Sequence, residues 1–257
     1  MTNQLIQNLP GDLTRLPSNG LIYDEGILDE SVINGEVNVY PMSAFEEVAM
    51  KDVNGIINGT TIPTVFARCV PQIKKPEELY EKDVNHLLMV LRKITYGNTI
   101  TVTYQHNCEN AKMHKYDIPL NSIINSVVYA DPTAILESYT AVMENGQVVQ
   151  LQPIRYIDII KLMQDAADYE SLSKFELQLK MLESTVNLVK SVDGETNKEK
   201  INEWCKKIPT TWFTKLTDAI VVGNNWGPQS AYPITCNDCQ SEIAIDIPLN
   251  PITFFLD

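Results

Sequence analysis

The sequence predicts an α+β fold with an extended N-terminal arm, short helices, two β-hairpin or zinc-ribbon-like knuckles, and a helical middle to C-terminal part. Three observations predict it: helically spaced apolar residues within 76–94, an alternating β-branched run at Thr99–Tyr104, and a Cys-x-x-Cys pair, Cys236 and Cys239, before a strand-like segment. The chain has 257 residues, 44% of them hydrophobic, so it can bury a core without disulfide bonds.

The order of the predicted elements divides the chain into four segments. We expect an extended arm over residues 1–35, an α+β lobe with hairpins and the first knuckle over 36–153, and a helical lobe over 154–222. A C-terminal knuckle and strand over 223–257 should return to the α+β lobe. The arm has several glycines and prolines but no sustained period, which is typical of a segment that lies on another surface.

A short strand and a capped helix are predicted after the arm. Residues 36–40 alternate polar and apolar side chains, and Pro41 ends this pattern. The hydroxyl of Ser43 stands three residues before the carboxylate of Glu46, which is the spacing of a reciprocal helix cap. A helix should therefore begin directly after Ser43.

The clearest helix is predicted over Pro76–Ile94. Its apolar residues recur every three or four positions, and Gly97 supplies the left-handed residue that often ends a helix. Beyond this helix, Thr99–Tyr104 and Tyr116–Leu120 have extended patterns and are joined by a loop that contains cysteine and histidine. These two segments predict a hairpin.

A second hairpin is predicted at Glu137–Met143 and Gln147–Pro153. Asn145 and Gly146 lie between the two segments and favour the positive φ angles of a tight turn. After this hairpin, residues 154–192 are predicted to form two helices.

The second of these helices has an apolar stripe with the spacing of a heptad seam. The stripe consists of Leu172, Phe175, Leu179, Leu182, Val186 and Val189. Two interpretations stay open, since fewer than three heptads do not require a coiled coil. The stripe packs within the chain, on residues 154–163 or the core, or it binds a partner in an intermolecular groove.

Two further helices, at Glu199–Lys207 and Thr211–Val222, contain a concentration of aromatic residues. Trp204, Trp212 and Phe213 belong to this group. If these side chains are exposed they mark a protein interface, and if they are buried they fill the core.

The sequence also contains a faint internal repeat. Residues 104–121 and 235–250 each contain a cysteine-bearing loop, and both end in Asp-Ile-Pro-Leu-Asn. Each copy has the pattern of strand, knuckle and strand. In a zinc ribbon two such knuckles face each other and share one metal ion.

The knuckles define a candidate metal site. Its candidate ligands are Cys236, Cys239, Cys108 and His106. In the first knuckle Gln105 stands where a leading cysteine would be, and His114 is an alternative to His106. Unligated thiols are the other interpretation. A redox pair is disfavoured because strand-like residues, and not a helix, follow Cys239. A structural zinc is thus a possible cofactor.

Composition and charge exclude several functional classes. Thirty-three acidic and twenty basic residues give a net charge of −13, which opposes nonspecific binding to nucleic acid. No segment approaches the ~20 apolar residues of a membrane span. The N-terminus lacks the pattern of a signal peptide, so we expect synthesis in a cytoplasm and five reduced cysteines.

We expect that the protein is not an enzyme. The sequence has no Gly-x-Ser-x-Gly elbow, no phosphate-binding loop, no dinucleotide fingerprint and no His-Glu-x-x-His. It has three histidines, of which His86 lies within the amphipathic helix, and its adjacent acidic pairs look like solvated helix starts. An enzyme with an unrecognised site of ordinary carboxylates is a remote alternative.

The most specific motifs lie within about the first 125 residues. They are the LPS-x-G-x-x-Y arm at Leu16–Tyr23, the V-x-V-x-P-M-[ST]-x-x-E-E block at Val37–Glu47, the segment Leu79–Gly97 with Asp83 and Arg92, and the Cys108 knuckle. In these motifs the chain resembles the baseplate proteins of T-even-type contractile-tailed phages. That family contains a baseplate hub subunit and a related hub assembly catalyst.

The resemblance implies a structural subunit of a baseplate hub that acts by protein–protein docking near the tail tip. It implies other phage baseplate and tail proteins as partners in a multi-protein complex, a location in the virion tail, assembly in the host cytoplasm, and no catalytic residues. The alternative is a nonstructural chaperone that catalyses hub assembly. The candidate interface residues are Leu16, Tyr23, Leu179 and Leu182.

Overall fold

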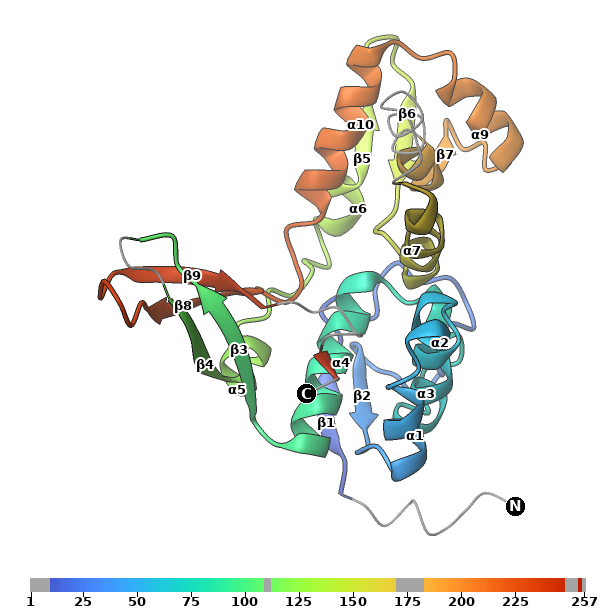
Figure 1. The fold of residues 1–257 in the computed structure, drawn as a ribbon. Helices are drawn as coiled ribbons and strands as arrows, with labels where there is room; N and C mark the ends of the chain where they lie inside the picture. Colours follow the sequence, from blue (N-terminus) through green and yellow to red (C-terminus); the bar gives the residue numbers. More distant parts are fainter. Residues whose placement is uncertain (1–9, 109–111, 170–182, 248–253, 256–257) are drawn as a thin grey trace. The chain divides into compact units, whose positions relative to one another are not determined.

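The computed structural model describes residues 10–108, 112–169, 183–247 and 254–255 and has a mixed α+β fold, as the sequence predicts (Figure 1). The chain divides into two compact units. Unit 1 comprises Met1–Pro76, Lys82–Tyr129 and Gly227–Asp257, and unit 2 comprises Glu77–Glu81 and Ala130–Trp226. In sequence, therefore, most of unit 2 is an insertion into unit 1.

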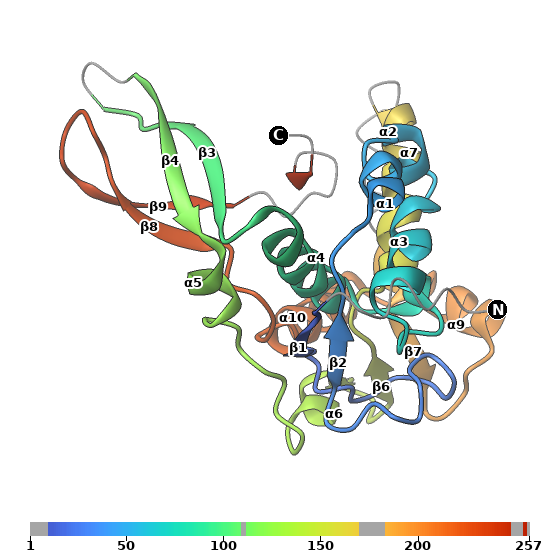
Figure 2. The same ribbon diagram turned by 90° about the horizontal axis from the view of Figure 1, so that it is seen from below.

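Unit 1 contains three antiparallel strand pairs and a group of helices. The strand pairs are β1 (Asp12–Arg15) with β2 (Glu36–Val39), β3 (Thr99–Gln105) with β4 (Met113–Pro119), and β8 (Ala231–Thr235) with β9 (Glu242–Asp246). The helices are α1 (Ala44–Ala49), α2 (Val53–Ile57), α3 (Thr61–Cys69), α4 (Glu81–Tyr96) and α5 (Leu120–Ile124). A 3₁₀ turn at Pro76–Glu78 precedes α4. Figure 2 shows the same elements from below.

The described part of the N-terminal segment is bound to the rest of unit 1. Strand β1 pairs with β2, and the backbone N–H of Leu16 donates to the carbonyl of Gly35 at 2.8 Å. The carboxylate of Asp83 in α4 then accepts hydrogen bonds from the Ser18 N–H at 2.9 Å and the Tyr23 hydroxyl at 2.7 Å. Tertiary hydrogen bonds thus hold a segment that has little regular structure of its own.

Helix α4 is the centre of the unit 1 core. Leu87, Met89 and Leu91 are completely buried, as is Phe66 of α3. At the end of the helix Gly97 has φ +99°, and its N–H donates to the Lys93 carbonyl at 2.9 Å. The predicted amphipathic helix and its C-cap are therefore confirmed, although the α-helix begins at Glu81 and not at Pro76.

Two other local predictions in unit 1 are confirmed. Ser43 and Glu46 form the reciprocal cap at the start of α1. Strands β3 and β4 form the predicted hairpin, in which Ile100 lies opposite Ile118. At the point where the chain leaves and re-enters unit 1, Val128 and Gly227 exchange backbone hydrogen bonds of 3.1 and 2.7 Å.

Unit 2 contains a three-stranded antiparallel sheet and several helices. The strands, in sheet order, are β5 (Thr140–Val142), β6 (Val148–Leu151) and β7 (Val189–Val192). The helices are α6 (Ile135–Ser138), α7 (Tyr156–Tyr169), α9 (Lys198–Cys205) and α10 (Thr210–Gly223). The predicted hairpin is confirmed at β5 and β6, but only Gly146 of the Asn-Gly pair has a positive φ, at +87°, and the start of the predicted first strand lies in helix α6.

The prediction of helix throughout residues 154–192 is wrong at its C-terminal end. Val189–Val192 forms β7, in which Val189 pairs with Leu151 and Val192 with Val149. A short run rich in β-branched residues fits either structure, and here the open edge of β6 gives these residues hydrogen-bond partners. The stripe residues from Leu172 to Leu182 lie outside the described residues.

The aromatic residues of unit 2 are partly buried. The rings of Trp204 and Trp212 lie 6.3 Å apart, and the Trp204 indole N–H donates to the Gln147 side chain at 3.2 Å. Tyr139 is 1% exposed, and its hydroxyl donates to Asn224 Oδ1 at 2.7 Å. These contacts are packing within the unit. In the described part of the chain, no helix combines the length and apolar character that a bilayer crossing needs.

Candidate metal centre

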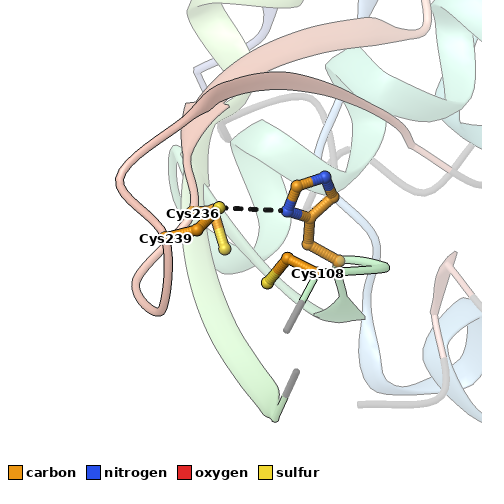
Figure 3. A group of neighbouring side chains, drawn as sticks. Cys108, Cys236 and Cys239 are labelled. Carbon is orange, nitrogen blue, oxygen red and sulfur yellow. Dashed lines mark hydrogen bonds between the residues drawn. The ribbon is translucent and has the colours of Figure 1, made fainter. Parts of the chain in front are cut away.

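The tips of two hairpins, β3–β4 and β8–β9, meet and bring four metal-binding side chains together. His106 and Cys108 come from the first tip, and Cys236 and Cys239 from the second. One ligand atom of each residue lies within 4.8 Å of the corresponding atoms of the other three. Figure 3 shows the three cysteine side chains gathered in one place. The structure thus brings together every residue of the predicted ligand set.

The second tip is a tight turn that directs both of its thiols to the same side. The N–H of Gln240 donates to the Cys236 carbonyl, and the N–H of Cys236 donates to the Ser241 carbonyl, both at 2.9 Å. Gln240 has φ +61°, a left-handed conformation that the turn imposes on a residue with a side chain. This conformation has a cost, which the cross-turn hydrogen bonds offset.

The first tip supplies two ligands, His106 and Cys108, that are two residues apart. The N–H of Cys108 donates to the His106 carbonyl at 3.0 Å, and His106 Nδ1 lies 3.4 Å from Cys239 Sγ. His114, the alternative ligand, has a different partner, since its Nε2 lies 3.0 Å from Asp238 Oδ2. The structure therefore selects His106 from the two histidines that the sequence left open.

Two further contacts join the hairpin tips beside the four ligands. Asp238 Oδ2 accepts the backbone N–H of Lys112 at 2.9 Å, and the N–H of Asn237 donates to the Tyr116 hydroxyl at 3.4 Å. Sequence reasoning missed Asp238. The signal was weak, because an aspartate within Cys-x-x-Cys reads as an ordinary turn residue.

The thiols of the cluster influence one another's ionisation. Hydrogen bonds from Ser241 lower the pKa of Cys239 to about 6. Desolvation and contact with Cys239 and Cys236 raise the pKa of Cys108 to about 12. A thiolate at one position therefore makes a second thiolate beside it unfavourable unless a positive charge is supplied.

The predicted interface residues and the third histidine, His86, do not belong to this cluster. Leu16 is completely buried within unit 1, and Tyr23 binds Asp83. Leu179 and Leu182 lie outside the described residues. His86 is completely buried, its Nε2 lies 2.8 Å from Thr14 Oγ1, and burial lowers its pKa to about 4. A neutral, enclosed imidazole of this kind has a packing role.

The fold and the site define a class of small α+β protein in which an inserted unit separates two hairpins that meet at a Cys/His cluster. Comparison with protein families gives the particular assignment. The family model of the T4 bacteriophage base plate protein matches residues 47–255, and the chain belongs to this family. No curated protein and no solved structure gave a significant match. The resemblance seen in the sequence is thus confirmed, and it gives the chain a role in a phage tail baseplate.

Proposed function

We propose that the protein is a structural subunit of the baseplate hub, docked to other tail proteins near the tail tip and without bond-making chemistry of its own. The observation that supports this most is the family match, because residues 47–255 include the described elements from α2 to β9 and so cover both units. The family is one of baseplate proteins and not a known class of enzyme.

Exposed apolar side chains support a docking role. In α1, Phe45 is 60% exposed and Val48 is 70% exposed, and they lie three residues apart, on one face of the helix. The guanidinium of Arg68 lies 4.7 Å from the centre of the Phe45 ring. An apolar pair flanked by a cation is a typical element of a protein interface, and a standard interface buries ~1,600 Å².

Unit 2 has exposed apolar side chains of its own. Val142 of β5 and Val148 of β6 are directly opposed in the sheet and are 58% and 43% exposed. The net charge of −13 favours neighbours with basic surfaces, because complementary potentials speed and orient association. Both units therefore offer apolar surface to neighbours within a largely acidic chain.

The composition of purified phage particles tests this proposal. Quantitative mass spectrometry should find the chain in mature tails at a fixed ratio to other baseplate proteins. Absence from mature tails, combined with failed baseplate assembly when its gene is deleted, would refute the structural role and indicate a nonstructural assembly chaperone.

A surface variant tests docking directly. Replacing both Phe45 and Val48 by Asp should reduce incorporation into particles, since burying an unpaired carboxylate at an interface is costly. Asn58→Asp, which adds a charge at another exposed position of unit 1, is the matched control and should be incorporated normally. Equal incorporation of both variants would show that this face of α1 does not dock.

A further inference from the structure

The cluster at the hairpin tips has the chemistry and dimensions of a zinc site. Zinc binds thiolates at about 2.3 Å and imidazole at about 2.0–2.1 Å, so the ligands of a tetrahedral site lie about 3.6–3.8 Å apart. In this structure the four ligand atoms lie within 4.8 Å of one another, and Cys239 Sγ is 3.4 Å from His106 Nδ1. We propose that Cys108, Cys236, Cys239 and His106 bind one structural Zn²⁺.

The donor set favours zinc over the common alkaline-earth ions. Three sulfur atoms and one imidazole nitrogen suit a borderline-soft ion, whereas Mg²⁺ and Ca²⁺ require oxygen ligands. The nearest carboxylate that the structure shows in contact with the tips, Asp238, is engaged by His114 and by the N–H of Lys112. Four protein ligands also complete a tetrahedron, which is the arrangement of a structural site without an open position.

The backbone places the ligands before any ion binds. The turn from Cys236 to Ser241 is closed by two hydrogen bonds, and Gln240 takes the left-handed conformation that this turn needs. In the first hairpin, the Lys112 N–H and His114 both contact Asp238, which stands between Cys236 and Cys239 in the sequence. The ion would therefore enter a nearly formed site and require only small side-chain movements.

A bound ion would stabilise the two hairpins, because they bury few apolar side chains. At their tips Gln105, Met113 and Glu242 are exposed, and along the strands the inward positions are mostly half-buried. Two-stranded hairpins with little apolar burial are marginal alone. A bound ion would supply the cross-link that apolar side chains do not, and it would join segments 128 residues apart, Cys108 and Cys236.

Two other uses of these residues fit less well. A nucleophilic Cys–His pair would need only Cys239 and His106, and it leaves unexplained the other two thiols within 4.8 Å. A disulfide would leave His106 without a role, and in the structure all five cysteines are free thiols. A shared metal ion uses all four groups at once.

The full-length chain, purified in the presence of thiol reductant and without chelator, provides the first test. Elemental analysis should find about one zinc per chain, and replacement by Co²⁺ should give the intense visible absorption of tetrahedral cobalt with thiolate ligands. Cys236→Ser and His106→Gln should each reduce the bound metal strongly. Cys69→Ala and Cys205→Ala, which alter buried thiols outside the cluster, should retain it.

A second measurement avoids any dependence on variants that fail to fold. In the unaltered chain, Cys239 should be alkylated slowly when zinc is bound and much faster after a strong chelator removes it, with peptide mapping to identify the modified thiol. Metal-free, folded protein that shows no cobalt absorption and the same alkylation rate with and without zinc would overturn the proposal. Rapid alkylation of Cys239 alone, insensitive to metal, would instead indicate a reactive thiol.

Discussion

Asp83 provides a quantitative test of how the N-terminal segment is held. Its carboxyl is completely buried in α4 and accepts hydrogen bonds from Ser18 and Tyr23. Burial raises the pKa of Asp83 from 3.8 to about 6, and the hydrogen bonds limit this rise. At about 1.4 kcal/mol per pKa unit, the difference between folded and unfolded states is worth about 3 kcal/mol.

The sign follows from which state binds the proton more tightly. The folded protein does, so the contribution of protonated Asp83 to stability is fully present below about pH 3.8 and is lost as the pH rises through about 6. Asp83→Asn keeps the shape of the side chain but cannot ionise. The free energy of unfolding of the unaltered protein minus that of the variant should therefore fall by about 2–3 kcal/mol between about pH 4 and pH 7.

Urea unfolding followed by circular dichroism measures this difference, and hydrogen exchange of α4 peptides assigns it to unit 1. Tryptophan fluorescence is unsuitable for this purpose because Trp204, Trp212 and Trp226 all belong to unit 2. Glu30→Gln, at an exposed position in the same unit, is the matched control and should leave the pH profile unchanged. Parallel pH profiles for Asp83→Asn and the unaltered protein would refute the reasoning.

Two further substitutions test single positions. Gly35 has φ +74°, and a Cβ there would lie 2.6 Å from the backbone of Asn19, so Gly35→Ala should cost about 2–4 kcal/mol in thermal unfolding experiments. Gly26→Ala, also left-handed but with open space around it, should cost only about 1–2 kcal/mol, and equal effects would contradict the predicted clash. Tyr139→Phe removes the bond to Asn224 and should lower the stability of unit 2 by about 1 kcal/mol in fluorescence-monitored urea unfolding. Unchanged stability would show that this buried bond has no net value.

The elements that the sequence predicted correctly are those whose signal is local. Helix α4 has an apolar period and a terminal glycine, Gly146 supplies the positive φ of the β5–β6 turn, and the Ser43 cap needs only a partner three residues away. Each of these three features depends only on residues that are close together in the sequence. Physical rules for local structure therefore suffice.

The elements that were missed or wrong depend on distant partners. Helix α3 has Pro63 in its first turn, which conceals its period, and β7 exists because β6 offers it hydrogen bonds. The contacts of the N-terminal segment with Asp83 were missed because Asp83 is 60 residues or more away in sequence. A local sequence pattern does not indicate such distant partners.

The candidate site was predictable in its residue types but not in its final selection. The repeated knuckle pattern singled out the three cysteines, whereas the choice between His106 and His114 depended on the path of the loop. In the structure Asp238 lies 3.0 Å from His114 and thereby decides the choice. His114 and Asp238 are 124 positions apart in the sequence, and a contact at such a separation cannot be recognised from one sequence.

Backbone hydrogen bonds between Val128 and Gly227 hold together the two ends of the intervening 98 residues. Unit 2 is also tied to the chain just before α4, because the N–H of Tyr156 donates to the Leu79 carbonyl at 2.7 Å and the N–H of Glu81 donates to the Ile154 carbonyl at 2.9 Å. Deleting the intervening residues would therefore leave Leu79 and Glu81 without these bonds, and a shortened chain should lose order at the start of α4 as well.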